Sequence, residues 1–332
     1  MNTAAALLLR VMPLTLVCAS AGAQLTTPQP DQKTSPVEFV DTLHKVFGDH
    51  HARAIHTKGL LLEGTFTPAA SAASVTTAPH LQKQALPVIL RFSNFAGVPD
   101  IPDNHPLAAP RGLAIKFKLP DGRSTDIVAH SFNGFPSANA DQFRELLLAL
   151  AASGPDAAKP TQLDAYLGEH PIAKAFLTTK QPTPVSYASL PYYGVNAFKF
   201  SNAQGAVSYG RYRIVPVAPA AYLSDAQNAK AAPGFLADEI RQRVKAGPVR
   251  LKLLLQIADK DDHVDDPSIA WPDSRRTVEL GTLSITRAVA DSATAEQSLI
   301  FTPSNLTAGI EIEDKMAEAR TAAYAVSFGE RQ

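Results

Sequence analysis

Eight short segments rich in β-branched and aromatic residues constrain the fold more than any other feature of this chain, because Pro, Gly and Asp separate them. They cover residues 60–68, 88–96, 112–119, 126–130, 198–201, 207–215, 250–258 and 277–286. The pair 198–201 and 207–215 is joined by Asn202-Ala-Gln-Gly205, which is typical of a hairpin turn. Helices do not alternate regularly with these strands, so the pattern predicts a closed antiparallel eight-stranded β-barrel instead of a parallel sheet.

Apolar residues at helical spacing appear in a few separate segments, so the predicted class is α+β. The first helix follows Ser35-Pro36-Val37-Glu38, which has the form of a capping box with proline at the first helical position. Its apolar residues recur as far as Phe47, and Gly48 is placed to end it. Further helices are predicted at 141–152, 161–178 and 235–246 and from Asp314 onward. We expect these helices to surround the barrel.

The first 23 residues have the pattern of a secretory signal peptide. An apolar run at 11–19 follows Arg10, and Ala21-Gly22-Ala23 offers a small-residue cleavage site. We therefore expect cleavage after Ala23, a periplasmic or secreted protein, a linker at 24–34 and a single domain at 35–332. The alternatives are an uncleaved anchor and a lipoprotein cleaved at Cys18, although the apolar run is shorter than the ~20 residues that span a bilayer.

Charge and cysteine usage exclude several classes of function. The chain has 31 basic and 31 acidic residues, so no net charge attracts nucleic acid or an anionic membrane. No later segment reaches membrane-spanning length. The only cysteine is Cys18, inside the predicted leader. The exported chain then has no thiolate, and any metal must be bound by His, Tyr or carboxylate groups.

Two short motifs carry candidate chemistry. Arg53-Ala-Ile-His56-Thr-Lys58-Gly59 places an imidazole between two cations at the start of the first strand. Arg320-Thr-Ala-Ala-Tyr324 puts a guanidinium and a phenol four residues apart, on one face of the last predicted helix. The cation favours phenolate over phenol, which makes the oxygen an anionic ligand for Fe(III). Taken singly, each motif also fits a structural role, as a hydrogen-bonded histidine or as an ordinary helix-surface pair.

Six motifs occur in the order in which haem catalases carry them, over most of the chain after the leader, and the chain resembles the small catalase-related peroxidase branch of that superfamily. They are Arg53-Ala-Ile-His-Thr-Lys-Gly59, Arg91-Phe-Ser-Asn-Phe-Ala-Gly97, Arg111-Gly-Leu-Ala-Ile-Lys-Phe117, Phe198-Lys-Phe200, Pro303-Ser-Asn-Leu306 and Arg320-Thr-Ala-Ala-Tyr324. The resemblance implies a catalase-like barrel with haem b between barrel and helices. Because the chain ends soon after Tyr324, we expect no C-terminal flavodoxin-like domain.

The resemblance also implies the residues at the centre of the site. His56 matches the distal base, and Ser93 matches the hydroxyl that orients its imidazole. Tyr324 matches the proximal iron ligand, and Arg320 matches the cation beside that ligand. A single neutral imidazole above the metal can take a proton from bound peroxide and deliver it to the departing oxygen. We therefore expect His56 to be the proton shuttle.

Three further residues are implied as contacts of the haem itself. Arg53 and Arg91 match the arginines that bind haem propionates. Phe143 falls where the family stacks an aromatic ring near the haem edge.

Several positions depart from the pattern of large catalases. Their Gly-Asn-Asn-Thr-Pro run supplies a distal asparagine, and here ungapped counting places His130 at that position. We interpret His130 as a loop residue, with a second polar distal group as the alternative, and Asn133 replaces the amide only if the loop shifts. The acidic residue expected just before Arg111 is missing. Phe95 replaces a smaller side chain and is expected to reshape access to the haem.

The expected function is a haem-dependent peroxidase that reduces hydrogen peroxide or organic hydroperoxides with an unidentified electron donor. Weak or no catalase activity is expected, because disproportionation requires a second, well-oriented peroxide. Two alternatives remain: a hydroperoxide isomerase like the catalase-like allene oxide synthases, and a non-catalytic haem-binding carrier. The presence of His56, Ser93 and Arg53 together argues against a carrier.

Overall fold

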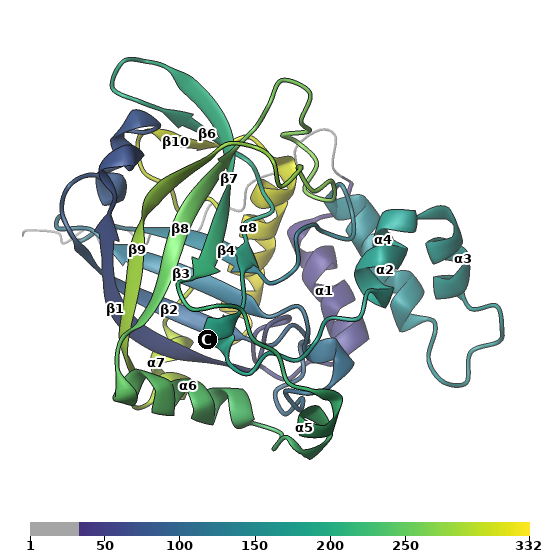
Figure 1. Cartoon of the computed structure of the whole chain (residues 1–332). Coiled ribbons are helices and arrows are strands. Elements are labelled where there is room, and N and C mark those ends of the chain that lie inside the picture. The colour runs from purple at the N-terminus through teal and green to yellow at the C-terminus, as the bar shows by residue number, and fades with distance from the viewer. Residues whose placement is uncertain (1–32) are drawn as a thin grey trace, which may run out of the picture.

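The computed structural model describes residues 33–332, which form ten strands and eight helices (Figure 1). The strands are β1 (Gly59–Pro68), β2 (Leu86–Ser93), β3 (Gly112–Lys118), β4 (Ser124–His130), β5 (Tyr192–Tyr193), β6 (Phe198–Ser201), β7 (Val207–Pro216), β8 (Val249–Ile257), β9 (Thr277–Ala288) and β10 (Ile310–Ile312). The helices are α1 (Pro36–Phe47), α2 (Ala140–Ala151), α3 (Gln162–Glu169), α4 (Pro171–Thr178), α5 (Asp225–Lys230), α6 (Phe235–Ala246), α7 (Ser292–Gln297) and α8 (Lys315–Gly329). None of the helices in this part of the chain is long and apolar enough to cross a membrane. The predicted leader at 1–23 and most of the predicted linker lie outside the described residues.

The predicted closed antiparallel eight-stranded barrel is confirmed. Its strands follow the order β7-β5-β4-β3-β2-β1-β9-β8, and β8 pairs with β7 to close the ring. One member differs from the prediction, since the two-residue strand β5 completes the ring in place of β6. The ten-residue β7 explains this: its first half pairs with β6, and Arg213 and Ile214 further along it pair with β5. The strands β6 and β10 extend the sheet beyond the barrel.

Alternate residues of the strands fill the inside of the barrel. Phe92, Leu113 and Ala129 stand opposite one another on β2, β3 and β4, and all three belong to the apolar core of the barrel. Other fully buried members of this core are Leu62, Phe66, Leu90, Phe117, Phe200 and Leu251. Burial of each such large apolar side chain contributes about 1.5–3 kcal/mol. The inside of the barrel is therefore packed apolar core.

The first helix forms as its sequence predicts. Ser35 Oγ accepts the backbone N–H of Glu38 at 3.2 Å, and a Glu38 carboxylate oxygen accepts the N–H of Ser35 at 2.9 Å. Gly48 ends the helix with a φ of 87°, a conformation that glycine adopts without strain. The apolar face of α1 packs against α2 and α8, where Phe39 and Phe143 are 5.5 Å apart between ring centres. These helices form a second apolar cluster outside the barrel.

The single helix predicted at 161–178 is wrong, since two helices, α3 and α4, occupy this stretch. His170 joins them with φ −122° and ψ 79°, outside the helical region. Proline at 171 is the cause, because its ring disfavours helical conformation in the preceding residue and it has no N–H to continue the hydrogen-bond ladder. The two short helices extend away from the barrel beyond α2 (Figure 1).

Candidate active site

One large cavity lies between the outer face of β2, β3 and β4 and the helices α1, α2 and α8. Its volume is about 1090 Å³, counted with its open mouth. All seven residues that the resemblance assigned to the site line it: Arg53, His56, Arg91, Ser93, Phe143, Arg320 and Tyr324. The fold therefore brings residues from both ends of the chain to the same space.

A row of the barrel wall makes room for the His56 ring. Ser93, Gly112 and His130 stand opposite one another on β2, β3 and β4, so their side-chain positions lie on one face of the sheet, which is the outer one. A Cβ atom on Gly112 would lie 2.7 Å from His56 Nδ1 and even closer to Ser93 Oγ. Only glycine leaves that space free. Gly112 lies within the motif at 111–117, and nothing in that motif alone indicated this role.

The backbone holds His56 in a conformation that a residue with a side chain rarely adopts. Its φ is 58°, in the left-handed region. Its N–H donates to the carbonyl of Phe95 at 2.7 Å, and its own carbonyl accepts Arg91 Nη1 at 2.9 Å. Arg91 Nη2 also donates to the carbonyl of Thr57 at 3.0 Å. Arg91 therefore braces the His56 backbone, and strain of this kind concentrates at functional sites.

The hydrogen bonds of the His56 ring define its tautomer. Nδ1 is 3.0 Å from the carbonyl oxygen of Asn94 and 3.1 Å from Ser93 Oγ. A carbonyl can only accept, so Nδ1 carries the hydrogen and Nε2 keeps a free lone pair. Burial, together with the nearby Arg91 and Arg320 guanidinium groups, lowers the pKa of His56 to about 3. The ring is therefore neutral near pH 7, with an unprotonated nitrogen available as a base.

A buried hydrogen-bond network holds Asn94, whose backbone carbonyl accepts the Nδ1–H of His56. The Asn94 side-chain oxygen accepts Arg111 Nη1 at 2.7 Å and the Tyr187 hydroxyl at 2.9 Å. The Asn94 amide donates to Asp103 at 2.8 Å, and Lys58 pairs with the same carboxylate at 2.9 Å. Asp103 is fully buried, and its backbone carbonyl accepts Arg111 Nη2. It thus lies beside the Arg111 guanidinium, although the position directly before Arg111 in the sequence has no carboxylate.

Arg320 holds the Tyr324 oxygen with two N–H donors. Nη2 is 2.8 Å and Nε 3.3 Å from the phenolic oxygen. Nη1 of the same guanidinium donates to Asn196 at 2.7 Å, and the Asn196 amide donates to Asp314 at 2.9 Å. Asp314 caps the start of α8, and burial raises its pKa to about 6. The predicted Arg–Tyr pair exists, and the phenolic oxygen is fixed as an acceptor that can offer a lone pair.

Two guanidinium groups contact one carboxylate at the edge of the cavity, and a third shares a backbone carbonyl with one of them. Arg91 Nε is 2.6 Å and Arg53 Nε 3.6 Å from the same oxygen of Glu296. Arg53 and Arg331 both donate to the carbonyl of Leu299, at 3.0 and 2.8 Å. Burial and the neighbouring Arg91 lower the pKa of Arg53 to about 9 and that of Arg331 to about 10. The cluster keeps a net positive charge, and the buried Nε of Arg331 has no partner.

Neither Glu296 nor Arg331 was singled out from the sequence. Glu296 lies on α7, a six-residue helix that was not predicted. Arg331 follows Tyr324 by seven residues and could have been found as a further cation close to the end of the last helix. Both act through tertiary contacts that no local pattern records.

Aromatic rings form much of the remaining cavity wall. Phe143, on α2, packs against Phe39 and Phe135, with ring centres 5.5 and 5.0 Å apart. Phe95 meets the His56 ring edge-on at 5.5 Å, and Phe176, on α4, lies 6.3 Å from Phe95. The expected position of Phe95 at the cavity is thus observed, and the wall near His56 is mainly apolar.

The interpretation of His130 as a loop residue is wrong. His130 is the last residue of β4, is 6% exposed and lines the cavity. Its position follows from strand alternation, since it shares the outer face of the barrel with Ser93 and Gly112. Asn133 is not among the residues that line the cavity.

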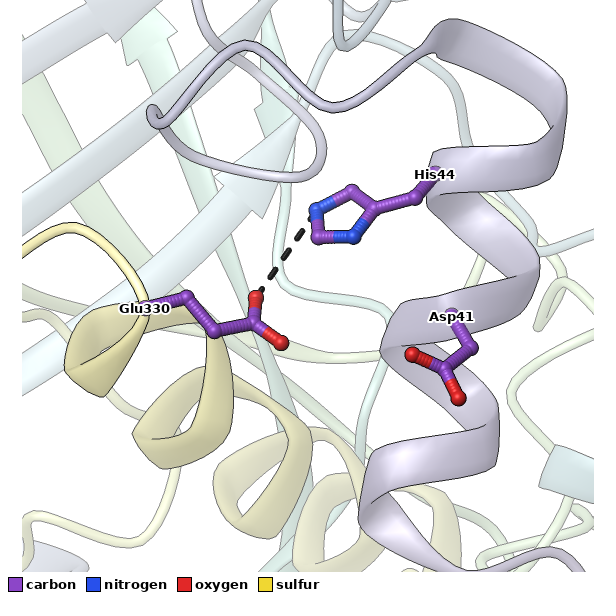
Figure 2. A group of neighbouring side chains, drawn as sticks. All are labelled: Asp41, His44 and Glu330. Carbon is purple, nitrogen blue, oxygen red and sulfur yellow. Dashed lines mark ion pairs between the residues drawn. The ribbon is translucent and has the colours of Figure 1, made fainter.

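A second group of potential metal ligands lies outside the cavity. Asp41 and His44 on α1 approach Glu330 at the end of α8, and their ligand atoms lie within 4.8 Å of one another (Figure 2). His44 Nε2 is 3.8 Å from a Glu330 oxygen. Asp41 and Glu330 are exposed, and none of the three lines the cavity. We interpret the group as a surface contact that joins α1 to α8.

The fold and the cavity place the protein among closed antiparallel β-barrels whose polar site lies outside the barrel, beneath a layer of helices. Residues 41–331 match the family described as Catalase, so the chain belongs to the catalase family. A catalase-related peroxidase of Mycolicibacterium paratuberculosis is 36% identical over 298 residues, which cover 88% of this chain and 93% of that protein. A catalase-related peroxidase of Synechococcus elongatus is 32% identical over 320 residues, covering 94% and 91%. The chain falls in this branch of the family.

Solved structures agree on the fold. A fungal catalase matches with a TM-score of 0.73 and 21% identity, covering 84% of this chain and 59% of that one. Catalase A from Saccharomyces cerevisiae matches with a TM-score of 0.73 and 20% identity, covering 84% and 61%. The chain spans about three fifths of the length of these catalases.

Proposed function

We propose that this protein binds haem b in the cavity and reduces hydrogen peroxide or organic hydroperoxides with an external electron donor. One observation carries the proposal: a neutral imidazole with a free Nε2 and a phenolic oxygen held by a guanidinium line the same cavity. The two relatives named catalase-related peroxidase support it, because they align over nearly the whole of both chains.

The residues present fit a haem. The cavity is lined mainly by apolar side chains, and rings such as Phe39 and Phe143 offer walls against which a flat macrocycle would pack. Tyr324 would bind the iron, as tyrosine does in catalases. The surplus positive charge of the arginine cluster, including the unpartnered Nε of Arg331, would pair with the carboxylates of the cofactor. When bound, the haem would supply the redox centre at which the peroxide oxygen–oxygen bond is cleaved.

His56 would move the proton. Its Nε2 accepts the proton of the incoming hydroperoxide and holds it as an imidazolium while the oxygen–oxygen bond breaks. The pKa of about 3 makes that imidazolium a strong acid, so the proton returns readily to the departing oxygen. Asn94 and Ser93 keep the ring in the tautomer and orientation that both transfers need. The residue that accepts the proton also delivers it.

We propose that peroxidase turnover dominates over disproportionation. The rings of Phe95 and Phe176 lie on the side of the cavity next to His56, where they would hinder the approach of a second peroxide. We also propose export to the periplasm or out of the cell, on the basis of the leader-like pattern at 1–23.

Parallel assays on one haem-loaded sample test the proposal. Oxidation of a phenolic or aromatic amine donor and release of oxygen would be followed after addition of hydrogen peroxide, and again after addition of an organic hydroperoxide. We expect donor oxidation with either peroxide and little oxygen. Rapid oxygen release without donor oxidation would contradict the peroxidase proposal, and failure to take up haem would contradict the cofactor.

A further inference from the structure

His130 carries a buried donor that the protein itself does not use. Its Nδ1 accepts the backbone N–H of Phe132 at 3.3 Å, and its Nε2 is buried with no hydrogen-bond partner. The rings of Phe135 and Phe176 lie 6.4 Å from the His130 ring. A buried polar atom without a partner costs free energy and requires an explanation.

The contact with Phe132 sets the tautomer of His130. A backbone N–H can only donate, so Nδ1 carries the lone pair and Nε2 carries the hydrogen of the neutral ring. Burial, with the charges of Arg320 and His56 nearby, lowers the pKa of His130 to about 3, so the ring stays neutral near pH 7. His130 and His56 are therefore neutral in opposite tautomers.

The barrel brings the two rings to one space. Ser93 and His130 lie in the same outward-facing row, one strand to either side of Gly112. Neighbouring strands are about 4.8 Å apart, so roughly 10 Å separate their backbones. The His56 ring lies against Gly112 between them, and both histidines line the cavity. Nδ1 of each ring is engaged by the backbone, which leaves Nε2 of each ring for a ligand.

We propose that His130 is a hydrogen-bond donor to the bound peroxide and that, with His56 as acceptor, it selects ligands that carry both a donor and an acceptor. A hydroperoxide satisfies both rings, and so does a small weak acid such as hydrogen cyanide, whereas an anion that arrives without a proton satisfies only His130. The inference rests on the proposed function, because it assigns a specificity residue to the same site.

His130 would keep its N–H throughout the reaction. The peroxide would lose its O–H proton to His56 Nε2, and the haem of the proposed function would supply the two electrons needed to cleave the oxygen–oxygen bond. The departing oxygen takes the same proton back from His56 and leaves as water or as an alcohol. Transfer of the His130 proton would create an imidazolate, so His130 supplies a hydrogen bond only.

The tautomers can be observed directly in the unmutated chain. The full chain, labelled with ¹⁵N-histidine and loaded with diamagnetic zinc protoporphyrin, would be studied by two-bond ¹H–¹⁵N NMR at pH 7. We expect protonated Nε2 for His130 and protonated Nδ1 for His56. A His130 ring protonated at Nδ1 would overturn the inference, whatever the variants below show.

Two variants separate the hydrogen bond from the shape of the side chain. In haem-loaded protein, His130→Leu removes the donor, and His130→Asn keeps an N–H. Loss of one hydrogen bond to the ligand predicts about tenfold weaker cyanide binding and about tenfold slower reaction with peroxide in His130→Leu. His130→Asn should retain most of both, and the stretching frequency of bound cyanide should shift only in His130→Leu.

The outcomes distinguish this inference from the proposed function. If unmutated protein binds haem and reacts with peroxide while His130→Leu matches it in cyanide affinity and rate, the His130 inference fails alone. If unmutated protein does not bind haem or react, the proposed function fails first. Haem uptake at one equivalent serves as the folding control for both variants, and the NMR result decides the tautomer where a variant does not fold.

Discussion

Two neighbouring rows of residues on β2, β3 and β4 have opposite roles. Phe92, Leu113 and Ala129 point into the barrel and pack in its apolar core. One residue along each strand, Ser93, Gly112 and His130 point outward to the cavity. The residues of the inner row pack against apolar neighbours in the core. The outer row leaves a gap at a glycine and a buried N–H without a partner.

The difference shows how one sheet can carry both stability and chemistry. Side chains alternate between the two faces of a strand, so a single strand supplies one residue to the core and the next to the site. The inner residues gain free energy from burial. In the outer row His130 has a buried N–H without a partner, and His56, which packs against Gly112 of this row, has a strained backbone. Substitutions in the two rows should therefore change different properties.

The largest effect is expected from His56→Ala. His56 lines the cavity with a free Nε2 lone pair, and its loss should slow the reaction with peroxide by about 10²- to 10⁴-fold, the range for general acid–base catalysis. Haem uptake should persist, because Tyr324 and the arginine cluster are unchanged. Stopped-flow spectra of haem-loaded protein provide the measurement. Unchanged reactivity would mean that the protein is a haem carrier and that the outer row has no chemical task.

Leu90→Ala tests the inner face of the barrel. Leu90 lies two residues before Phe92 on β2, is fully buried in the barrel core and does not line the cavity, and the void left by the missing carbons should lower the free energy of unfolding by about 2–5 kcal/mol. Urea unfolding measures this loss. The rate of reaction with peroxide per haem-loaded molecule should stay close to that of the unmutated protein. A large loss of rate with little loss of stability would contradict the assignment of stability to the inner row and of chemistry to the outer row.

Gly112→Ala should have the opposite effect, with a loss of rate that exceeds the loss of stability. The new Cβ atom would displace Ser93 Oγ and the His56 ring, and a misplaced base costs about 10- to 100-fold in rate. Gly168→Ala is the matched control, because a Cβ atom at Gly168, on α3, meets nothing within 4 Å. Rates at saturating donor would be compared for both variants. Equal rates would show that the His56 ring does not need the space at Gly112.

The smallest effect is expected from His80→Leu, at a histidine that packs against the barrel core. His80 lies against Phe117 of the barrel core, and burial lowers its pKa to about 3. As pH falls below about 6.5, the unfolded chain binds a proton that the folded chain does not, so stability is lost between about pH 6.5 and 3. His80→Leu should make the fall in unfolding free energy shallower by up to about 1.4 kcal/mol per pH unit.

Unfolding midpoints at several pH values between 4.5 and 6 measure that slope. Asp126 and Asp314 have raised pKa values, which oppose the trend equally in both proteins. Activity of the His80→Leu protein should match that of the unmutated chain, since His80 does not line the cavity. Identical slopes would mean that His80 is protonated within the fold.

Much of the fold could be predicted because its signals are local. The capping box at Ser35 and the glycine at 48 set the ends of α1, and Asn202–Gly205 marks the hairpin between β6 and β7. The strand β5 could not be predicted, because two residues carry no periodicity. Pro171 could have indicated the break between α3 and α4, but the helical spacing of apolar residues on both sides of it favoured a single helix.

The site was predictable where its residues lie within one motif. Arg320 and Tyr324 are four apart on one helix, and their contact follows from helix geometry. Glu296 and Arg331 meet the rest of the site only through the folded chain. The segment predicted at 126–130 already placed His130 in a strand, but the face of the barrel on which it lies follows from its pairing with Gly112 on β3.

The most direct test of the account is a visible absorption spectrum of the haem-loaded protein beside that of its Tyr324→Phe variant. If Tyr324 binds the iron, the unmutated protein should take up one haem per chain and show the high-spin ferric spectrum of a tyrosinate ligand. The variant should lose that signature. The same spectrum in both proteins, or no haem uptake by the unmutated chain, would contradict the assignment of the cavity.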